Sequence, residues 1–490
     1  MDRVQRVCGA AAGTGGPQGR PDDISRRGDT GTSGAGAPTA IASACPISVL
    51  VPTYNRHDTL LKCLGALETQ TVGVFEVVVV DDGSTDGTET ALSGRSFRFP
   101  LRYYRQANQG PGVARNLAME VAQGEVVLFI GDDIIADARL LEQHLVAHTR
   151  HPEPGAAILG HIDWPPWLER TAVMDYVCGA GSQQFAYHHI ATEPALDFKY
   201  FYTSNISLKR RFVAAALRAG VGFDPCFRYA GFEDSEYAYR LEARGLAIHY
   251  WKAALAYHDH WMDLDSFSRR EYKAGQMAVV FYRKHPQLDE VLEVGWIGDW
   301  VDAVEQLLAR PAELERLTAL DRHTDEVFRG LVRRIEHLLG GGEPPGDAGR
   351  PPGRDDPGLR AALHNLFGVI FDIERTRGRV EEWYAGVGDR GHVAAAKTLL
   401  GWRKKLELLS VSVREVRALR AQLVKREATA NYFRATAEHF KDEAERFKGE
   451  LAEILSSPSW RLVRRLQAIR LRLFPRGSQR ERLYLRLRDR

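Results

Sequence analysis

The sequence has little of what marks disulfide-stabilised, zinc-binding or membrane-spanning proteins. Its five cysteines are odd in number, widely spaced and without a Cys-x-x-Cys pair. Neither a disulfide scaffold nor a zinc site is therefore expected, and a reducing compartment fits. No apolar run approaches the roughly 18 residues of a membrane-spanning helix. The formal net charge is only +2 over 490 residues, so no overall field favours nucleic acid.

The chain is long enough for two or three domains. Residues 1–44 are rich in Gly, Ala, Thr, Ser and Arg without periodicity, which predicts a disordered leader. They include no apolar stretch typical of a secretory signal. The predicted divisions that follow are a catalytic domain (45–265), a helical extension (266–339), a Gly/Pro linker (340–358), a helical segment (359–401), a coiled coil (402–455) and a basic amphipathic tail (456–490).

Acidic clusters stand where apolar runs end. The four valines of 77–80 lead into Asp-Asp-Gly-Ser at 81–84, and the apolar run 126–130 leads into Gly-Asp-Asp at 131–133. Such short runs are typical of buried parallel strands, and open α/β sheets bind ligands beyond the carboxyl ends of these strands. Carboxylates gathered there are costly to bury unless a cation is present. The pattern predicts a divalent metal and a phosphorylated substrate.

Strand and helix patterns alternate along the first part of the chain. Strands are predicted over 47–51, 75–80, 101–104 and 126–130. Gly110-Pro111-Gly112 is expected to start a helix with Val113, Leu117 and Val121 as its apolar stripe. This alternation predicts an α/β fold with a mostly parallel, Rossmann-like sheet flanked by helices and joined by right-handed crossovers.

Four motifs together resemble a known family. They are Pro-Thr-Tyr-Asn-Arg at 52–56, Val-Asp-Asp-Gly-Ser-Thr-Asp at 80–86, Gly-Asp-Asp at 131–133 and Phe-Glu-Asp-Ser-Glu at 232–236. In this order they resemble the family 2 glycosyltransferases of the GT-A fold, which are inverting enzymes that use nucleotide sugars. The resemblance covers about residues 46–260. It implies transfer of a sugar from a nucleoside diphosphate sugar to a glycan or glycolipid hydroxyl in cell-surface polysaccharide or glycolipid synthesis.

The resemblance also assigns residues to the donor site. It implies that Asp82 accepts hydrogen bonds from the nucleotide base, whereas Asp81 could equally cap the turn that follows. The other residues implied to line the nucleotide are Pro52, Thr53, Tyr54 and Arg56.

The Gly-Asp-Asp sequence corresponds to the family's metal motif. Asp133 is implied as the ligand of Mg²⁺ or Mn²⁺, and Asp132 as a contact to the ribose or to the metal's waters. Gly131 stands where the family often has a first acidic residue, which puts a two-aspartate clamp in doubt. His258, or as second choice His260, is implied as a further metal contact; the alternative is a structural histidine.

Glu233 and Asp234 open a helical stretch. The resemblance implies that Asp234 is the catalytic base and that Glu233 holds acceptor hydroxyls. The alternative is that both acids have no catalytic role and are present only because the helix dipole favours negative charge in the first helical turn. The dipole is expected to keep Asp234 ionised at neutral pH. Asn205, and Trp164 from an aromatic-rich region, are expected to line the acceptor site.

The last part of the chain shows a seven-residue repeat from Trp402 to Leu451, which predicts a coiled coil for a homo-oligomer or a partner protein. The alternative is a long amphipathic helix folded back on the enzyme. Residues 461–490 hold eleven arginines, and the tail resembles Ser-x-Ser-Trp-Arg tails of bacterial cell-surface glycosyltransferases. It is expected to lie on an anionic membrane, on the cytoplasmic inner face, rather than only in solvent.

Two rival functions follow from the same residues. A catalytically degenerate scaffold of a glycan-assembly complex, carried by the coiled coil, is suggested by Gly131. A nucleotidyltransferase would want a Gly-rich phosphate loop with an early lysine, which residues 52–56 lack. Nucleic-acid binding has no folded module to support it.

Overall fold

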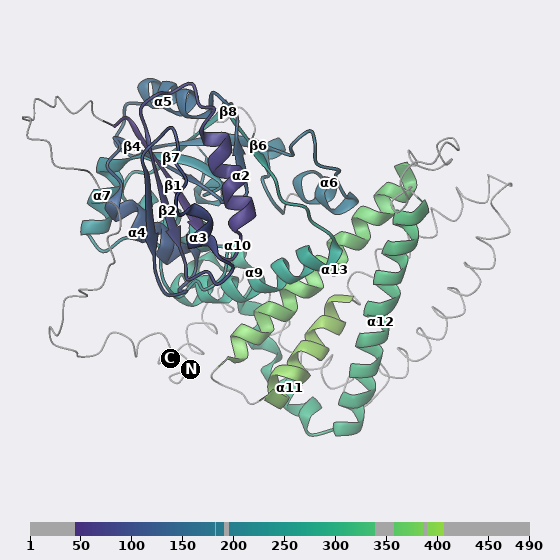
Figure 1. Cartoon of the computed structure of the whole chain (residues 1–490). Coiled ribbons are helices and arrows are strands. Elements are labelled where there is room, and N and C mark those ends of the chain that lie inside the picture. Colours follow the sequence, from purple (N-terminus) through teal and green to yellow (C-terminus); the bar gives the residue numbers. More distant parts are fainter. Residues whose placement is uncertain (1–44, 182, 191–195, 339–356, 386–389, 406–490) are drawn as a thin grey trace, which may run out of the picture. The chain divides into compact units, whose positions relative to one another are not determined.

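The computed structural model describes residues 45–181, 183–190, 196–338, 357–385 and 390–405 (Figure 1). The predicted leader, most of the linker, all but the start of the coiled coil and the whole basic tail lie outside these residues. The chain divides into two compact units. The sheet unit contains residues up to Glu169 and Phe185–His260, and the helical unit contains Arg170–Gln184 and the residues from Trp261 onward.

The sheet unit is built on one eight-stranded mixed sheet of order β3-β2-β1-β4-β7-β6-β8-β5. Its strands are β1 (Ile47–Thr53), β2 (Glu76–Asp81), β3 (Leu101–Arg105), β4 (Val126–Ile130), β5 (Ile134–Ala136), β6 (Ala156–Asp163), β7 (Asn205–Lys209) and β8 (Ala247–His258). The first four are parallel, β7 runs antiparallel to β4 and β6, and β8 is parallel to β6. The predicted mostly parallel sheet is confirmed.

Helices cover both faces of the central strands. Every residue of β2 and β4 is buried, which for a strand with alternating side chains requires cover on each side. Both strands contain apolar runs rich in β-branched or aromatic side chains, which suit a fully packed, pleated surface. The helices of this unit are α2 (His57–Leu67), α3 (Thr88–Leu92), α4 (Pro111–Val121), α5 (Leu140–Arg150), α7 (Arg210–Arg218) and α8 (Glu233–Glu242).

The predicted apolar stripe of α4 is wrong. Val113, Leu117 and Val121 are only half-buried, whereas Ala114 and Ala118 are fully buried. The small side chains face the sheet because they let the helix backbone come close to β1 and β2. The larger apolar residues therefore lie along the margins of the contact.

The helical unit consists of α6 (Ala172–Cys178), α9 (Leu264–Lys284), α10 (Asp289–Leu292), α11 (Val301–Leu308), α12 (Pro311–Leu338) and α13 (Pro357–Tyr384), followed by helical residues up to 405. Its main contact is between α9 and α13. A Cβ on Gly275 would lie 2.0 Å from the Arg375 carbonyl oxygen, and one on Gly378 would lie 1.8 Å from that of Tyr272. The two helix backbones therefore meet at a pair of glycines. Among the described residues, no helix is long and apolar enough to cross a membrane.

Candidate active site

Three of the predicted motifs meet at the carboxyl ends of β1, β2 and β4. The strands are neighbours and parallel, so the loops after them share one edge of the sheet. Asn55 joins two loops, since its N–H donates to Ser84 Oγ (2.9 Å) and its Oδ1 accepts from the Thr85 N–H (2.7 Å). Thr53 Oγ1 donates to Asp132 Oδ2 at 2.8 Å. Asn55 adopts φ +53°, an unfavourable backbone that these bonds hold in place.

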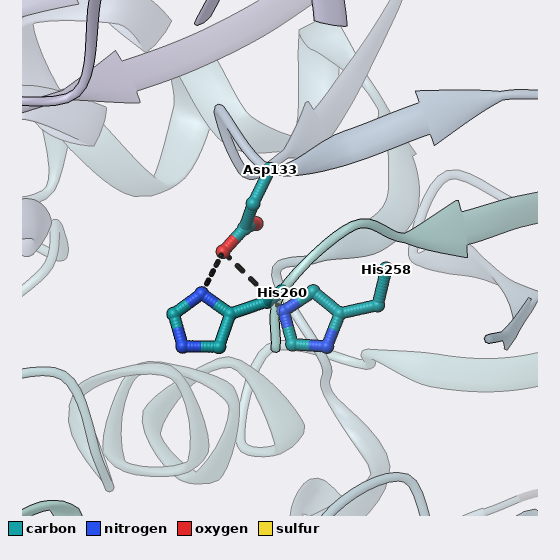
Figure 2. A group of neighbouring side chains, drawn as sticks. All are labelled: Asp133, His258 and His260. Carbon is teal, nitrogen blue, oxygen red and sulfur yellow. Dashed lines mark hydrogen bonds and ion pairs between the residues drawn. The ribbon is translucent and has the colours of Figure 1, made fainter. Parts of the chain in front are cut away.

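Asp133 forms a cluster with two histidines that follow it by more than 120 residues in the sequence (Figure 2). His258 Nε2 lies 3.3 Å and His260 Nδ1 lies 3.5 Å from Asp133 Oδ2. They reach it because β8 pairs with β5, placing His258 opposite Ile134, and because the Asp259 N–H donates to the Asp133 carbonyl at 2.9 Å. Both the first and the second choice of histidine are therefore at the candidate metal site.

The donor atoms of this cluster fit a divalent ion. One carboxylate oxygen and two imidazole nitrogens suit Mn²⁺ or another transition metal better than Mg²⁺, which prefers oxygen ligands. Burial alone would raise the pKa of Asp133, but His258, then His260 and Arg56, hold it well below its usual value. The carboxylate is thus kept ionised, as a metal ligand must be.

Arg56 lies between the two aspartates of the motif. Its Nη1 is 2.9 Å from Asp132 Oδ1 and 3.0 Å from Asp133 Oδ2, and its Nη2 is 2.9 Å from His260 Nδ1. Asp132 is buried, and burial together with the charge of Asp133 raises its pKa to about 7. The guanidinium therefore adds to the two histidines in stabilising the charge of these carboxylates.

Gly131 leaves room for the Asp133 carboxylate. A Cβ at this position would lie 2.6 Å from Asp133 Oδ1, well inside van der Waals contact. The departure from an acidic first residue thus has a steric reason here. We expect Gly131→Ala to displace that carboxylate and to weaken Mn²⁺ binding by about 10- to 100-fold, the usual cost of disturbing the support of a metal ligand.

The measurement for Gly131→Ala is the Mn²⁺ dissociation constant, from titration followed by electron paramagnetic resonance. Gly65→Ala is the matched control, because Gly65 lies within α2 with nothing within 4 Å of an added Cβ. Its Mn²⁺ affinity should equal that of the parent. Equal affinities for the Gly131 and Gly65 variants would contradict the steric role of Gly131.

Asp82 accepts hydrogen bonds from the segment that leads into α4. Its Oδ1 accepts from Gln106 Nε2 (2.7 Å) and the Gln109 N–H (2.9 Å), and its Oδ2 accepts from the Gly110 N–H (2.8 Å). Asp81 caps the turn that follows it, which is one of its two expected roles: the Ser84 N–H donates to its Oδ1 at 2.7 Å. The sequence does not predict that residues 106–110 bind the Asp82 carboxylate, although Gly110-Pro111 does indicate the start of a helix there.

The remaining donor-loop residues differ in exposure. Tyr54 is 47% exposed at the rim, whereas Thr53 is buried and Pro52 is half-buried in β1. Of these four donor-loop residues, Arg56 is the one that hydrogen-bonds to the candidate metal ligands, Asp133 and His260. The resemblance implies only that the Arg56 side chain contacts the nucleotide.

Asp234 lies at the same edge of the sheet. Asn205 pairs with Ile130, so Thr203 stands beside the carboxyl end of β4, and its backbone donates to the Asp234 carboxylate. The expectation that the helix start keeps Asp234 ionised at neutral pH is met only in part. Burial, reinforced by the charge of Glu233, raises its pKa to about 7, outweighing the helix dipole.

Glu233 is hydrogen-bonded within the protein. It is 2% exposed, its Oε1 accepts from Arg115 Nη1 (3.0 Å) and its Oε2 from the Gly231 N–H (2.6 Å). Because each oxygen accepts a bond from the protein, Glu233 joins the start of α8 to α4. The residue before it, Phe232, adopts φ +70°, which this ion pair helps to hold. Arg115 gave no signal in the sequence because it lies far from Glu233 along the chain.

The two expected acceptor contacts are also turned inward. Asn205 is fully buried; its Nδ2 donates to the carbonyls of His161 and Ala254, and its Oδ1 lies 2.8 Å from His144 Nε2. It therefore joins β7 to its neighbours in the sheet. Trp164 is buried and stacks on His258 with ring centroids 5.4 Å apart. It packs against a candidate metal ligand, and its contact with an acceptor stays a prediction.

Comparison with known proteins agrees with this site. Residues 48–165 match the model of glycosyl transferase family 2. Validoxylamine A glucosyltransferase from Streptomyces hygroscopicus subsp. jinggangensis is 30% identical over 280 residues, which are 51% of this chain and 64% of that protein. The poly(ribitol-phosphate) beta-glucosyltransferase of Bacillus spizizenii is 37% identical over 101 residues, 19% of this chain and 16% of that protein. The chain thus spans less than two thirds of these relatives.

Among solved structures, S. aureus TarS aligns with a TM-score of 0.37 and 18% identity, covering 69% of this chain and 55% of that one. The assignment rests on the family match and on the acidic motifs gathered at one edge of the sheet. Residues 48–165 of this chain are therefore a glycosyl transferase family 2 region.

Proposed function

We propose that this glycosyltransferase moves one sugar from a nucleoside diphosphate sugar, with inversion, to a hydroxyl of a glycan or a lipid-linked acceptor. The observation that carries the proposal is the convergence of Asp133, His258 and His260 beside the carboxyl end of β4, the edge to which Asp234 also belongs. The relatives' names, a validoxylamine A and a poly(ribitol-phosphate) glucosyltransferase, support a hexose donor.

The donor would bind with its diphosphate toward the metal cluster. A divalent ion held by Asp133, His258 and His260 would supply charge neutralisation of the leaving diphosphate. Asp82 has three of its acceptor positions occupied by the protein, which leaves one for a base N–H. Tyr54 at the rim would face the nucleotide, and the Arg56 guanidinium would contact phosphate oxygens of the donor.

Asp234 would act as the base. As the acceptor oxygen attacks the anomeric carbon, its proton would pass to Asp234 and the bond from the anomeric carbon to the diphosphate oxygen would break. Attack from the face opposite the leaving group inverts the anomeric configuration. A carboxylate with its pKa near 7 is a stronger base than an ordinary aspartate and is still largely ionised slightly above neutrality.

The test is thermal unfolding with UDP-, GDP- and dTDP-sugars, each with and without Mn²⁺, followed by assay of nucleoside diphosphate release. A ligand that binds only the native state raises its stability by mass action. We expect a Mn²⁺-dependent shift with one nucleotide class. No shift with any of them would overturn the proposal and favour the scaffold alternative. Attachment to an anionic membrane, and oligomerisation through the coiled coil, depend on residues after 405 and stay predictions.

A further inference from the structure

A second cluster of metal-binding side chains lies away from the active site. His151, Glu153 and His249 each offer a ligand atom, and these three atoms lie within 4.8 Å of one another. The two imidazole rings are stacked, with centroids 3.9 Å apart and planes 20° apart. Both histidines are half-buried, and Glu153 is exposed, so an ion could enter from solvent.

Three structural elements bring these residues together. His151 follows the last residue of α5, Glu153 lies in the loop after it, and His249 stands near the start of β8 opposite Ile158 of β6. Figure 1 shows α5 alongside β8, and the two elements are in contact. Along β6, the partner of His249 is Ile158 and the partner of Tyr257 is Asp163, so His258 lies about 20 Å further along the sheet at roughly 3.3 Å per residue. The cluster is therefore remote from the active-site histidines.

The backbone of the cluster is held in place before any ion binds. Lys209 Nζ donates to the carbonyl of His151 (2.6 Å) and to that of Glu153 (2.8 Å), which fixes the loop from 151 to 153. The His151 N–H closes the last turn of α5 on the Ala147 carbonyl at 2.9 Å. The C-terminal end of a helix carries partial negative charge, which favours a cation and offsets part of the repulsion from Lys209.

We propose that His151, Glu153 and His249 bind a divalent transition-metal ion, with Zn²⁺ as the best match. Two imidazoles and one carboxylate form a three-ligand set that leaves a fourth position for water. Around an ion with bonds of about 2.0–2.2 Å, tetrahedral ligand atoms stand roughly 3.3 Å apart. The present spacing needs a closure of at most about 1.5 Å, which rotation of the exposed Glu153 can supply. Because the two imidazole planes are nearly parallel, ion binding also requires the rings to turn until both nitrogen lone pairs face the ion. The lack of Cys-x-x-Cys excludes a thiolate site but not this one.

The bound ion would join the end of α5 to the start of β8. Because it binds the folded arrangement, it would raise the temperature of unfolding. Imidazole nitrogens bind soft and borderline ions more strongly than they bind Mg²⁺ or Ca²⁺, so Mg²⁺ should not compete for this site. The site would be structural, and it does not depend on the proposed sugar transfer.

The experiment measures Zn²⁺ binding to the untagged full chain by calorimetry, in an Asp133→Ala background that removes a ligand from the active-site cluster. One equivalent of Zn²⁺ should bind and should raise the unfolding temperature, with excess Mg²⁺ present. Adding His151→Gln or Glu153→Gln should raise the dissociation constant at least tenfold, and adding His249→Gln should do the same. His151 and Glu153 lie in a loop after α5, so these variants test the site even if His249→Gln does not fold.

The matched control replaces His188 and His189 with glutamine. These rings also lie close together, with centroids 4.1 Å apart, but they belong to neither group of candidate ligands found among the described residues. Their loss should leave Zn²⁺ binding unchanged. Absence of binding in the Asp133→Ala protein, or binding that survives both His151→Gln and Glu153→Gln, would overturn the proposal. Either result leaves the outcome of the donor-binding test unaffected.

Discussion

Replacing Asp234 with asparagine is expected to lower kcat by about 10²- to 10⁴-fold, the usual contribution of a general base. The amide has nearly the same shape as the carboxylate but cannot accept the proton of the acceptor hydroxyl. The dissociation constant for the donor should change little, because the candidate donor contacts lie on other loops. Single-turnover rates and donor titration measure the two quantities separately.

The pH dependence of the parent enzyme follows from the same residue. The pKa of Asp234 is raised from its usual value to about 7, so the carboxyl group is protonated and inactive as a base below pH 7 and ionised above it. We therefore expect kcat to fall about tenfold per pH unit below 7 and to level off above about 8. A flat profile between pH 5 and 8, or normal turnover by Asp234→Asn, would contradict the assignment.

Two controls separate chemistry from folding in that experiment. Asp302 is an exposed acid in the first turn of α11, so Asp302→Asn makes the same chemical change at a helix start without affecting activity. Between the ordinary aspartate pKa and about 7 the folded state binds more protons at Asp234 than the unfolded state, so this group lowers stability as pH rises through that range, and the loss remains at pH 8. The asparagine variant should therefore be at least as stable as the parent at pH 8.

Replacing Gly378 with alanine is expected to destabilise the helical unit by more than about 3 kcal/mol, at the upper end of the cost of overpacking. The added Cβ would lie 1.8 Å from the Tyr272 carbonyl oxygen, which belongs to the backbone of α9. No side chain can move aside to make room, so α9 and α13 must separate along their contact. Gly275→Ala should act in the same direction, since its Cβ would meet the Arg375 carbonyl at 2.0 Å.

The measurement is guanidinium-induced unfolding followed by far-ultraviolet circular dichroism, comparing midpoints within the helical transition. Gly330→Ala is the matched control, because Gly330 lies within α12 with nothing within 4 Å of an added Cβ. Alanine there should stabilise the helix by about 0.5–1 kcal/mol through its higher propensity. If Gly378→Ala also proved stabilising, the close approach of the two helices would be refuted.

The sequence by itself determined the strands and the positions of the acidic motifs. Continuous apolar runs predict buried strands because both faces must be apolar, and Asp132 and Asp133 follow one of these runs after a single glycine. Parallel strands bring their carboxyl ends to one edge, so the meeting of three motifs there could also be predicted. Asp234 at the start of a helix belongs to the same class of local signal, because helix starts favour acids.

Only the tertiary structure decided which of these side chains face the site. His258 and His260 reach Asp133 because β8 pairs with β5, a contact between segments far apart in the chain. Glu233 and Asn205 are polar residues at motif positions, but their hydrogen bonds are taken up by Arg115, by His144 and by main-chain groups. A sequence pattern reports residue types and periodicity, whereas the partners of a buried polar group depend on packing between distant elements. Gly131 shows the same: only the position of the Asp133 carboxylate explains why no side chain is present there.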